Sequence, residues 1–241
     1  NTVSTANGSG HGGGIYLEAE KNTTLQVLGC TVYSNMAHYG NGGGVYMSGE
    51  GGVCQIKSNA AGRTTEIGGA ANKGNKATSS APGTTAGQNT GNGGGIGIFI
   101  KGRIEMQGGT VSYNTADTSG GGIAVNGSTM EFTDGTVTNN AALYGGGISL
   151  TNSGDPTTIA DQSLKNPPAL TPAWGMVFTN GTVTYNLADI GGGICISNNS
   201  TMKLDGGKVN TNYAATKSGS SYSSTNNQNG GGIDDGSKTG H

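Results

Sequence analysis

Carboxylates are the side chains of this chain best suited to catalysis, and two aspartates recur at one place in a repeated motif. Asp117 and Asp189 each directly follow an Asn-x-Ala motif, whereas Leu143 takes that place in the copy between them. If the copies are strands stacked about 4.8 Å apart, the two carboxylates lie roughly 10 Å apart, at or beyond the outer limit for the acid pair of an inverting glycosidase. We therefore expect no enzyme, and a polysaccharide lyase or hydrolase is a minor alternative.

Two glycine-rich stretches match catalytic or cofactor motifs by their letters alone. The run His11–Gly14 (HGGG) matches the oxyanion element of some lipases, but the chain has no Gly-x-Ser-x-Gly nucleophile elbow. Gly8-x-Gly10-x-x-Gly13 fits a dinucleotide fingerprint, yet no helical pattern follows it. We interpret both as parts of a repeat and expect no organic cofactor.

An acidic pair, Asp234 and Asp235, follows the last triple glycine. Carboxylate oxygens are ligands that calcium prefers, so this pair is the candidate metal site, with a solvated acidic pair as the alternative. The calcium-binding nonapeptide GGxGxDxUx is absent, and aspartate does not recur at a fixed position of the repeat. Calcium therefore remains an alternative to a protein without a metal ion.

The elements that position these residues come from a repeat headed by three glycines. The triple glycine opens units at Gly12, Gly42, Gly93, Gly120, Gly145, Gly191 and Gly230. The shortest unit, which begins at Gly120, is about 25 residues long, a period typical of solenoid proteins. The longer units look like that unit with inserts.

Each unit carries three apolar elements after its glycines. An apolar-x-apolar pair such as Ile123–Val125 is followed by a second pair such as Met130–Phe132 and then by Val-x-x-Asn-x-Ala. In the second unit, either Cys54–Ile56 or Thr65–Ile67 could form the second pair. The asparagines of the third element are Asn35, Asn75, Asn114, Asn140, Asn186 and Asn212, with Asn75 displaced by one residue from its apolar partner.

Apolar residues that alternate with a period of two predict β-strands, and short strands separated by glycine or asparagine predict a parallel β-solenoid. We expect an all-β, right-handed parallel β-helix of six to seven coils with three short strands each, in which equivalent residues stack. The asparagines would form a structural corner ladder, because asparagine tolerates the left-handed backbone region and stacked amides can hydrogen-bond along the axis. The glycines would supply positive φ or close backbone approach.

The chain is expected to be a single solenoid domain, residues 1–241, with loop inserts near 57–92, 153–175 and 217–229. Inserts can leave and rejoin a solenoid without disturbing its stacking, so surface decoration is the main interpretation. The insert 153–175 holds Trp174, the only tryptophan. This residue is the candidate for a contact with the solenoid wall or with a neighbouring molecule.

Composition excludes several classes of protein. The chain has 49 glycines, but they do not fall at every third position, which excludes collagen. A net charge of −2 gives no electrostatic basis for binding nucleic acid, and no apolar run is long enough to cross a bilayer. We expect Cys54 to face inward, Cys195 to face outward and Cys30 to lie at a corner, so no disulfide within the chain is expected.

One run of residues carries a family resemblance. The segments Val32–Ala37 (VYSNMA) and Gly42–Tyr46 (GGGVY) resemble the FxxN and GGA[ILV] repeats of polymorphic outer-membrane proteins. They are also similar to the repeats of right-handed parallel β-helix proteins on bacterial surfaces, although valine replaces the phenylalanine and glycine the alanine. The resemblance covers nearly the whole chain and implies extracellular display, with adhesion to a host or matrix surface or glycan.

The stretches before the first triple glycine and from the last one onward together nearly match one minimal coil. We therefore expect a secreted or cell-surface structural solenoid that associates with itself through its ends, as a filament subunit or stalk segment, because exposed strand edges need cover. An adhesin or glycan-binding module is the alternative. An ice-binding face is a minor alternative, based on a threonine row interrupted near Ala70 and at Lys208; its threonines are Thr31, Thr110, Thr136 and Thr182.

Overall fold

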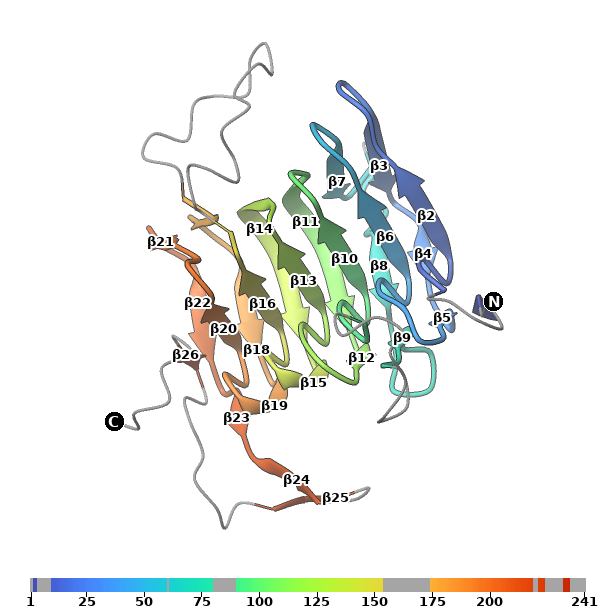
Figure 1. The fold of residues 1–241 in the computed structure, drawn as a ribbon. Helices are drawn as coiled ribbons and strands as arrows, with labels where there is room; N and C mark the ends of the chain where they lie inside the picture. The colour runs from blue at the N-terminus through green and yellow to red at the C-terminus, as the bar shows by residue number, and fades with distance from the viewer. Residues whose placement is uncertain are drawn as a thin grey trace.

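The computed structural model describes residues 2–3, 10–59, 61–79, 90–153, 174–218, 221–223 and 232–234. Within these residues the only regular secondary structure is the β-strand. The strands form three parallel sheets and one small antiparallel ribbon. No helix long and apolar enough to span a bilayer occurs in this part of the chain. Figure 1 shows the strands of successive coils side by side along one axis, which confirms the predicted parallel β-helix.

The first sheet is built from the strands that follow the triple glycines. In spatial order these are β2 (Ile15–Glu18), β6 (Val45–Ser48), β10 (Ile96–Phe99), β13 (Ile123–Asn126), β16 (Ile148–Thr151), β20 (Ile194–Ser197) and β26 (Ile233–Asp234). Equivalent residues are paired directly, for example Ile96 with Ile123 and Ile148 with Ile194. The triple glycines therefore lie above one another.

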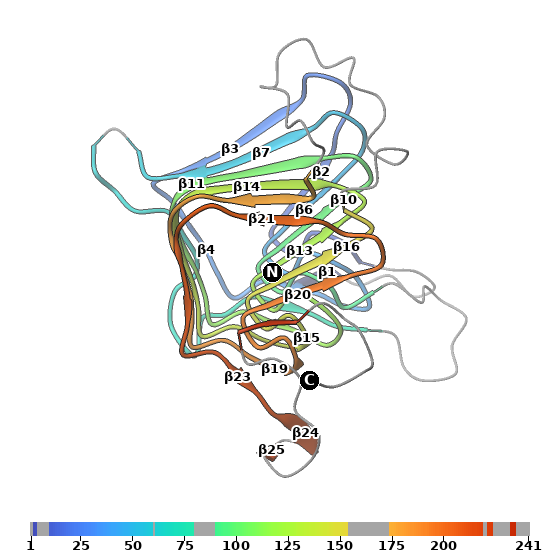
Figure 2. The same cartoon turned by 90° about the vertical axis from the view of Figure 1, so that its left-hand side faces the viewer.

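The second sheet turns a corner, so it forms two sides of the coil (Figure 2). Before the corner lie β3 (Thr24–Leu28), β7 (Val53–Lys57), β17 (Met176–Phe178) and β21 (Met202–Leu204); after it lie β4 (Thr31–Val32), β8 (Glu66–Gly68), β18 (Thr182–Thr184) and β22 (Lys208–Asn210). The long strands β11 (Arg103–Ser112) and β14 (Thr129–Thr138) run through the corner. Glycines with positive φ, Gly109 and Gly135, make the bend.

The third sheet carries the Asn-x-Ala motif. Its strands, in order, are β1 (Thr2–Val3), β5 (Met36–Ala37), β9 (Lys76–Ala77), β12 (Thr115–Ala116), β15 (Ala141–Tyr144), β19 (Leu187–Ile190) and β23 (Tyr213–Ala214). The antiparallel ribbon of β24 (Thr216–Ser218) and β25 (Ser221–Ser223) follows β23. Within the described residues, six coils thus contribute to all three sheets, while β1 and β26 each add a strand to one sheet.

The core is one continuous cluster of apolar side chains inside the coils. Ile98, Met106 and Phe132 of the middle coils are fully buried, and the rings of Phe132 and Phe178 stack with centroids 4.7 Å apart. These side chains come from alternate positions of the strands, as the period of two predicted. Each layer is therefore stabilised mainly by the layers on either side of it.

The asparagines form a continuous hydrogen-bonded ladder at the corner before the third sheet. From Asn35 to Asn186, the backbone N–H and the Nδ2 of each asparagine donate to Oδ1 of the next, at 2.9–3.1 Å. The left-handed backbone conformation, which was expected at the asparagines, occurs at a neighbouring residue. The residue before the asparagine takes the positive φ, at Ser34, Tyr113, Asn139, Tyr185 and Thr211. The asparagine itself stays aligned with its neighbours, which is what lets its amide continue the ladder.

The triple glycines meet two different requirements. The first glycine of each triplet from Gly12 to Gly191 has a positive φ, which is 63° at Gly120 and 61° at Gly145, and this favours a residue without Cβ. The second and third lie against the next coil: a Cβ on Gly121 would come 2.5 Å from the carbonyl oxygens of Ala141 and Gly146. Both positive φ and close approach therefore act in this motif.

The second coil settles an ambiguity of the sequence and corrects one expectation. Cys54 and Ile56 form its second apolar pair, and Ile67 takes the place of the valine in the third element. The threonine row is interrupted by Glu66, which pairs with Thr31 and Thr110, and not by Ala70. Both β8 and β9 lie inside the stretch 57–92, so part of that stretch belongs to the solenoid wall.

The three cysteines differ in exposure. Cys54 is buried in the core and Cys30 is exposed, while Cys195 lies on the outward side of the first sheet and is nevertheless buried. None of the three takes part in a disulfide within the described residues. Burial raises the pKa of the Cys54 thiol to about 12, so this thiol stays protonated at neutral pH.

We expect Gly121→Ala to lower the free energy of unfolding by about 3 kcal/mol or more, because the added methyl group meets two backbone oxygens that cannot move independently. Gly127→Ala is the matched control: Gly127 has a φ of +56° but nothing within 4 Å of its Cβ position, so it should cost only about 1–2 kcal/mol. Urea unfolding of the two variants measures the difference. Equal costs would show that the triplet is not packed against the next coil.

Candidate functional site

The two aspartates at equivalent corner positions stay apart in the structure. Thr115 pairs with Ala141, and Ala141 with Leu187; this register places Leu143 between Asp117 and Asp189. The Oδ2 of Asp117 accepts a hydrogen bond from the backbone N–H of Ser79 at 3.1 Å. The structure therefore brings no second carboxylate from this row next to Asp117.

The other candidate residues lie at the edge of the described part of the chain. Asp234 belongs to β26, opposite Cys195, whereas Asp235 lies outside the described residues. Trp174 is partly buried just before β17, and the rest of its insert, 154–173, lies outside them, as does most of 217–229. Within the described ranges, no three His, Cys, Asp or Glu side chains gather in a group that could hold a metal ion.

A polar network on the outside of the second sheet was missed by the sequence analysis. Glu105 and Glu131 pair directly on β11 and β14, and Arg103 forms ion pairs with both, at 2.9 Å to Glu105. The amides of Gln55 and Gln107 also donate to Glu105. Gln55, Glu105 and Glu131 each lie between the two members of a second apolar pair, a position that faces outward. Polar residues at this one position of successive repeats were the signal in the sequence.

This network is arranged to hold coils together. The carboxylate of Glu105 accepts from one guanidinium and two amides, and one of these amides, that of Gln55, belongs to the preceding coil. The Nε of Arg103 is buried and has no hydrogen-bond partner in the described part of the chain, while its Nη2 bridges the two glutamates. These contacts fix the register of β7, β11 and β14.

An aromatic stack covers the outside of the first sheet at its N-terminal end. The ring of Tyr46 stacks on Tyr16 with centroids 5.6 Å apart and on His11 at 4.6 Å, and it lies tilted against Phe99 at 5.4 Å. Tyr46 and Phe99 are buried, but Tyr16, on the first coil, is 52% exposed. The outermost ring of the stack, that of Tyr16, is therefore exposed to solvent.

His11 also begins a second ladder of hydrogen bonds. The backbone N–H of Asn41 donates to Nδ1 of His11 at 3.0 Å, and the backbone N–H and Nδ2 of Asn92 donate to Oδ1 of Asn41 at 2.9 Å. His11 thus takes the place of an asparagine, as an acceptor. Burial lowers the pKa of His11, which favours the neutral ring that this bond requires.

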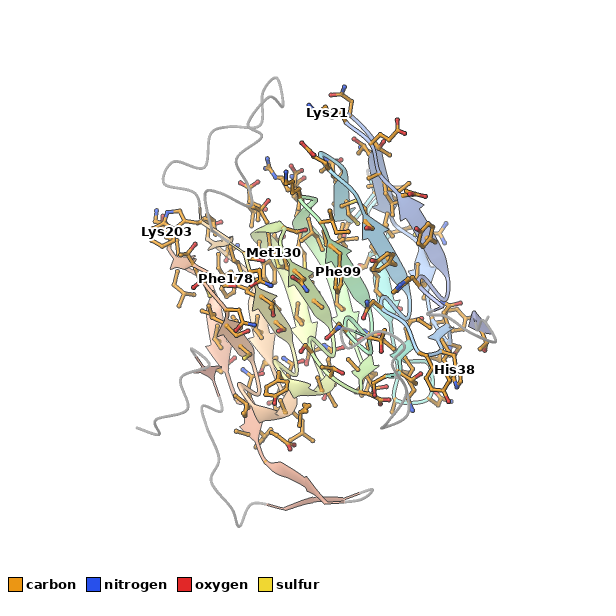
Figure 3. The ribbon with its side chains drawn as sticks, in the orientation of Figure 1. Lys21, His38, Phe99, Met130, Phe178 and Lys203 are labelled. Atoms are coloured by element: carbon orange, nitrogen blue, oxygen red, sulfur yellow. The ribbon has the colours of Figure 1, made fainter. Side chains whose placement is uncertain are left out.

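At the two ends of the solenoid, the inward apolar side chains of the repeat are not fully covered. Three inward residues of the first coil, Ile15, Leu17 and Leu25, are only partly buried, as are Ile196, Met202 and Val209 of the sixth, whereas Val27 and Ile194 of the same two coils are buried. Leu204, also on the sixth coil, is 50% exposed. Figure 3 shows Lys21 and Lys203 at opposite ends of the stack, with Phe99, Met130 and Phe178 between them.

Backbone and ladder groups are open at these ends as well. The edge strands β2, β3, β21 and β23 are the outermost strands of full coils in their sheets. Among the described residues, nothing donates to Oδ1 of Asn35, and nothing accepts from the backbone N–H of Asn212. The ends are therefore the candidate functional site. They are apolar inside and, as far as the described residues go, carry backbone groups without a partner at the rim.

The fold and these ends define the class of protein: a parallel β-helix with six full coils among the described residues, whose terminal coils leave apolar side chains incompletely buried. Comparison of the chain with protein-family models, with curated proteins and with solved structures finds no match. Function is accordingly argued from the geometry.

Acidification should loosen the first coil. Because the pKa of His11 is lower in the folded protein than the ordinary 6.5, the unfolded chain takes up the proton more readily. Stability that is fully present above about pH 6.5 is therefore lost as the pH falls below that value. Hydrogen exchange at the Asn41 amide, corrected for intrinsic rate, should accelerate severalfold between pH 7.5 and pH 5.

The matched variant for this test is His11→Asn, which keeps an acceptor of the kind that Asn41 itself provides and removes the titrating ring. It should abolish the change at Asn41, whereas His38→Asn should preserve it. Unchanged exchange at Asn41 in the parent protein across this pH range would contradict the role given to His11.

Proposed function

We propose that this chain is a structural β-solenoid of the cell exterior whose two ends associate with further copies, as a filament subunit or stalk segment. The observation that carries the proposal is the exposed interior at both ends, with Leu204 half exposed and Leu17 and Val209 only partly buried. Equivalent side chains in the middle coils, such as Ile98, are fully buried. Covering such side chains stabilises the assembly by about 25 cal/mol per Å².

The polarity of the asparagine ladder favours head-to-tail association. Every step donates from the lower-numbered coil to the higher, from Asn35 to Asn212. The N-terminal end therefore presents an acceptor and the C-terminal end a donor. The acceptor of one end can bind the donor of the other, so the contact joins two different surfaces of the molecule. Such a heterologous contact builds an open filament when its rotation does not close into a ring.

The extracellular placement is supported by the resemblance of the repeat to those of polymorphic outer-membrane proteins and of other bacterial surface β-helix proteins. The motifs behind that resemblance, Val-x-x-Asn-x-Ala and the triple glycine, here form ladders along the axis. A shaft built on such ladders lengthens by adding coils without a change of cross-section, which suits a stalk or a filament.

Association through the ends is tested by placing a charge on one of them. Leu204→Lys puts an ammonium group on the exposed apolar rim of the last coil, and we expect it to abolish assembly because the charge would have to be desolvated. Ile100→Lys is the matched control, since Ile100 is 60% exposed in a lateral turn of a middle coil. It should assemble like the parent protein.

Light scattering across a range of protein concentration, together with electron microscopy, reads out the assembly, and circular dichroism checks that both variants remain folded. Rods many times longer than one molecule are expected for the parent protein and for Ile100→Lys. A parent protein that stays monomeric at every concentration would rule out the filament.

A second candidate function, adhesion, is favoured by tyrosines along one corner. Tyr33, Tyr185 and Tyr213 lie within two residues of the ladder asparagines and are 47%, 53% and 53% exposed. Exposed tyrosines are typical of binding surfaces. A glycan and matrix-protein array tests this function, with loss of binding expected for the triple Tyr→Ser variant; an array without a hit would remove it.

A further inference from the structure

The described part of the chain contains four steps in which an asparagine is followed by a glycine. At such a step the backbone nitrogen of the glycine can attack the side-chain amide of the asparagine, because no Cβ on the glycine stands in the way. The asparagines of these steps are Asn41, Asn92, Asn126 and Asn180. How readily each one reacts depends on whether that nitrogen and that amide are already held by hydrogen bonds.

Three of the four glycine N–H groups are hydrogen-bonded to the neighbouring coil. They donate to carbonyl oxygens at 2.8–2.9 Å, from Gly42 to Asn92, from Gly93 to Ser119 and from Gly127 to Thr151. The asparagines are held as well, since Asn41 and Asn92 are buried and Oδ1 of Asn126 accepts a hydrogen bond from Asn152 at 3.3 Å. Reaction at these steps requires a bond between coils to break first.

The fourth step, Asn180–Gly181, has neither restraint. Asn180 is exposed, and within the described ranges its side chain makes no hydrogen bond and the N–H of Gly181 has no acceptor. The carbonyl oxygen of Gly181 accepts from the N–H of Lys208 on the next coil. The step lies at the bend of the second sheet, between β17 and β18.

The preceding coil shows which geometry this bend allows. β14 pairs with β17 before the bend and with β18 after it, and the same number of residues separates the paired positions on both coils, so Asp134 and Asn180 are equivalent. Oδ1 of Asp134 accepts a hydrogen bond from the backbone N–H of the next residue, Gly135, at 2.8 Å. The φ angles of the two glycines are similar, 117° at Gly135 and 107° at Gly181. A side chain at this position therefore reaches the nitrogen that follows it.

We infer that Asn180 is a site of spontaneous deamidation, with water as the co-reactant. The backbone nitrogen of Gly181 gives up its proton to hydroxide and bonds to Cγ of Asn180. The bond from Cγ to Nδ2 breaks, and Nδ2 takes up a proton from water and leaves as ammonia. Water then opens the cyclic succinimide: aspartate forms if the ring nitrogen separates from Cγ, and isoaspartate forms if it separates from the backbone carbonyl carbon.

Both products place a new negative charge on the fifth coil, about 4.8 Å along the axis from the level of Asp134. Aspartate reproduces the arrangement of Asp134 and can accept from the N–H of Gly181, so the wall keeps its register. Isoaspartate adds a carbon atom to the main chain between β17 and β18, which displaces Thr182 from its partner Thr136. The modified fraction increases with the age of the molecule, independently of any association of the ends.

Peptide mapping by mass spectrometry tests this inference on the folded protein. After incubation in mildly alkaline buffer, aspartate and isoaspartate are measured at each of the four steps. We expect Asn180 to react at least about tenfold faster than any of the other three asparagines, because one hydrogen bond fewer has to break. Incubation in concentrated denaturant is the control, since the unfolded steps should all react at similar rates.

Two variants test the role of the bend, with circular dichroism to check that both remain folded. Asp134→Asn creates an asparagine–glycine step at the equivalent position of the fourth coil, and it should react as fast as Asn180 does. Asn180→Gln keeps an amide at the exposed position but lengthens the side chain by a methylene group, which slows ring closure. Modification at position 180 should then be lost.

Three results would overturn the inference. The first is an equal rate at Asn180 and Asn126 in the folded protein. The second is a lead of Asn180 that persists in denaturant, because the local sequence and not the bend would then be responsible. The third is a lack of reaction at position 134 of the Asp134→Asn variant, which removes the equivalence of the two bends.

Discussion

Hydrogen bonding between successive coils is the constraint on which this structure depends. A single coil encloses too few apolar side chains to offset the entropy of ordering its chain, so each coil depends on its neighbours for stability. The backbone bonds of three sheets supply that neighbour relation, and the asparagine ladder extends it through a corner where no strand pairs among the described residues. The requirement is met throughout the middle coils and fails at the first and last.

Glycine allows the hydrogen bonding between successive coils to continue without a gap. At Gly44 and Gly122 a Cβ would come 2.7 Å from a carbonyl oxygen of the next coil and 3.0 Å from the Nδ2 of a ladder asparagine. The triplet therefore brings the ladder corner and the start of the first sheet into direct contact. That contact explains why so glycine-rich a chain is ordered here, since the glycines serve packing rather than flexibility.

Much of the fold could be predicted from the sequence because the repeat defines which residues are equivalent. The triple glycine and Val-x-x-Asn-x-Ala were enough to predict the sheets, the inward pairs and the rows of stacked residues. What could not be predicted depends on local backbone geometry. The repeat does not say that the residue before the asparagine, such as Tyr113, absorbs the left-handed turn, or that Ile67 replaces a valine across an insert.

The candidate site was only partly accessible from sequence for a related reason. Outward positions vary between coils, so the bridge from Arg103 to Glu105 and Glu131 becomes visible only once the register is known. The open ends were expected from the repeat. That β1 and β26 extend different sheets depends on where each partial coil falls on the perimeter, which the spacing of the repeats does not reveal.

The side-chain amides of the asparagine ladder all point the same way. Their dipoles are therefore parallel over six coils, and each polarises its neighbours in a surrounding of low dielectric constant. The binding free energy of one amide for the next accordingly increases with the number of amides already aligned. A long stack is then more cohesive per layer than a short one, and fraying is confined to its tips.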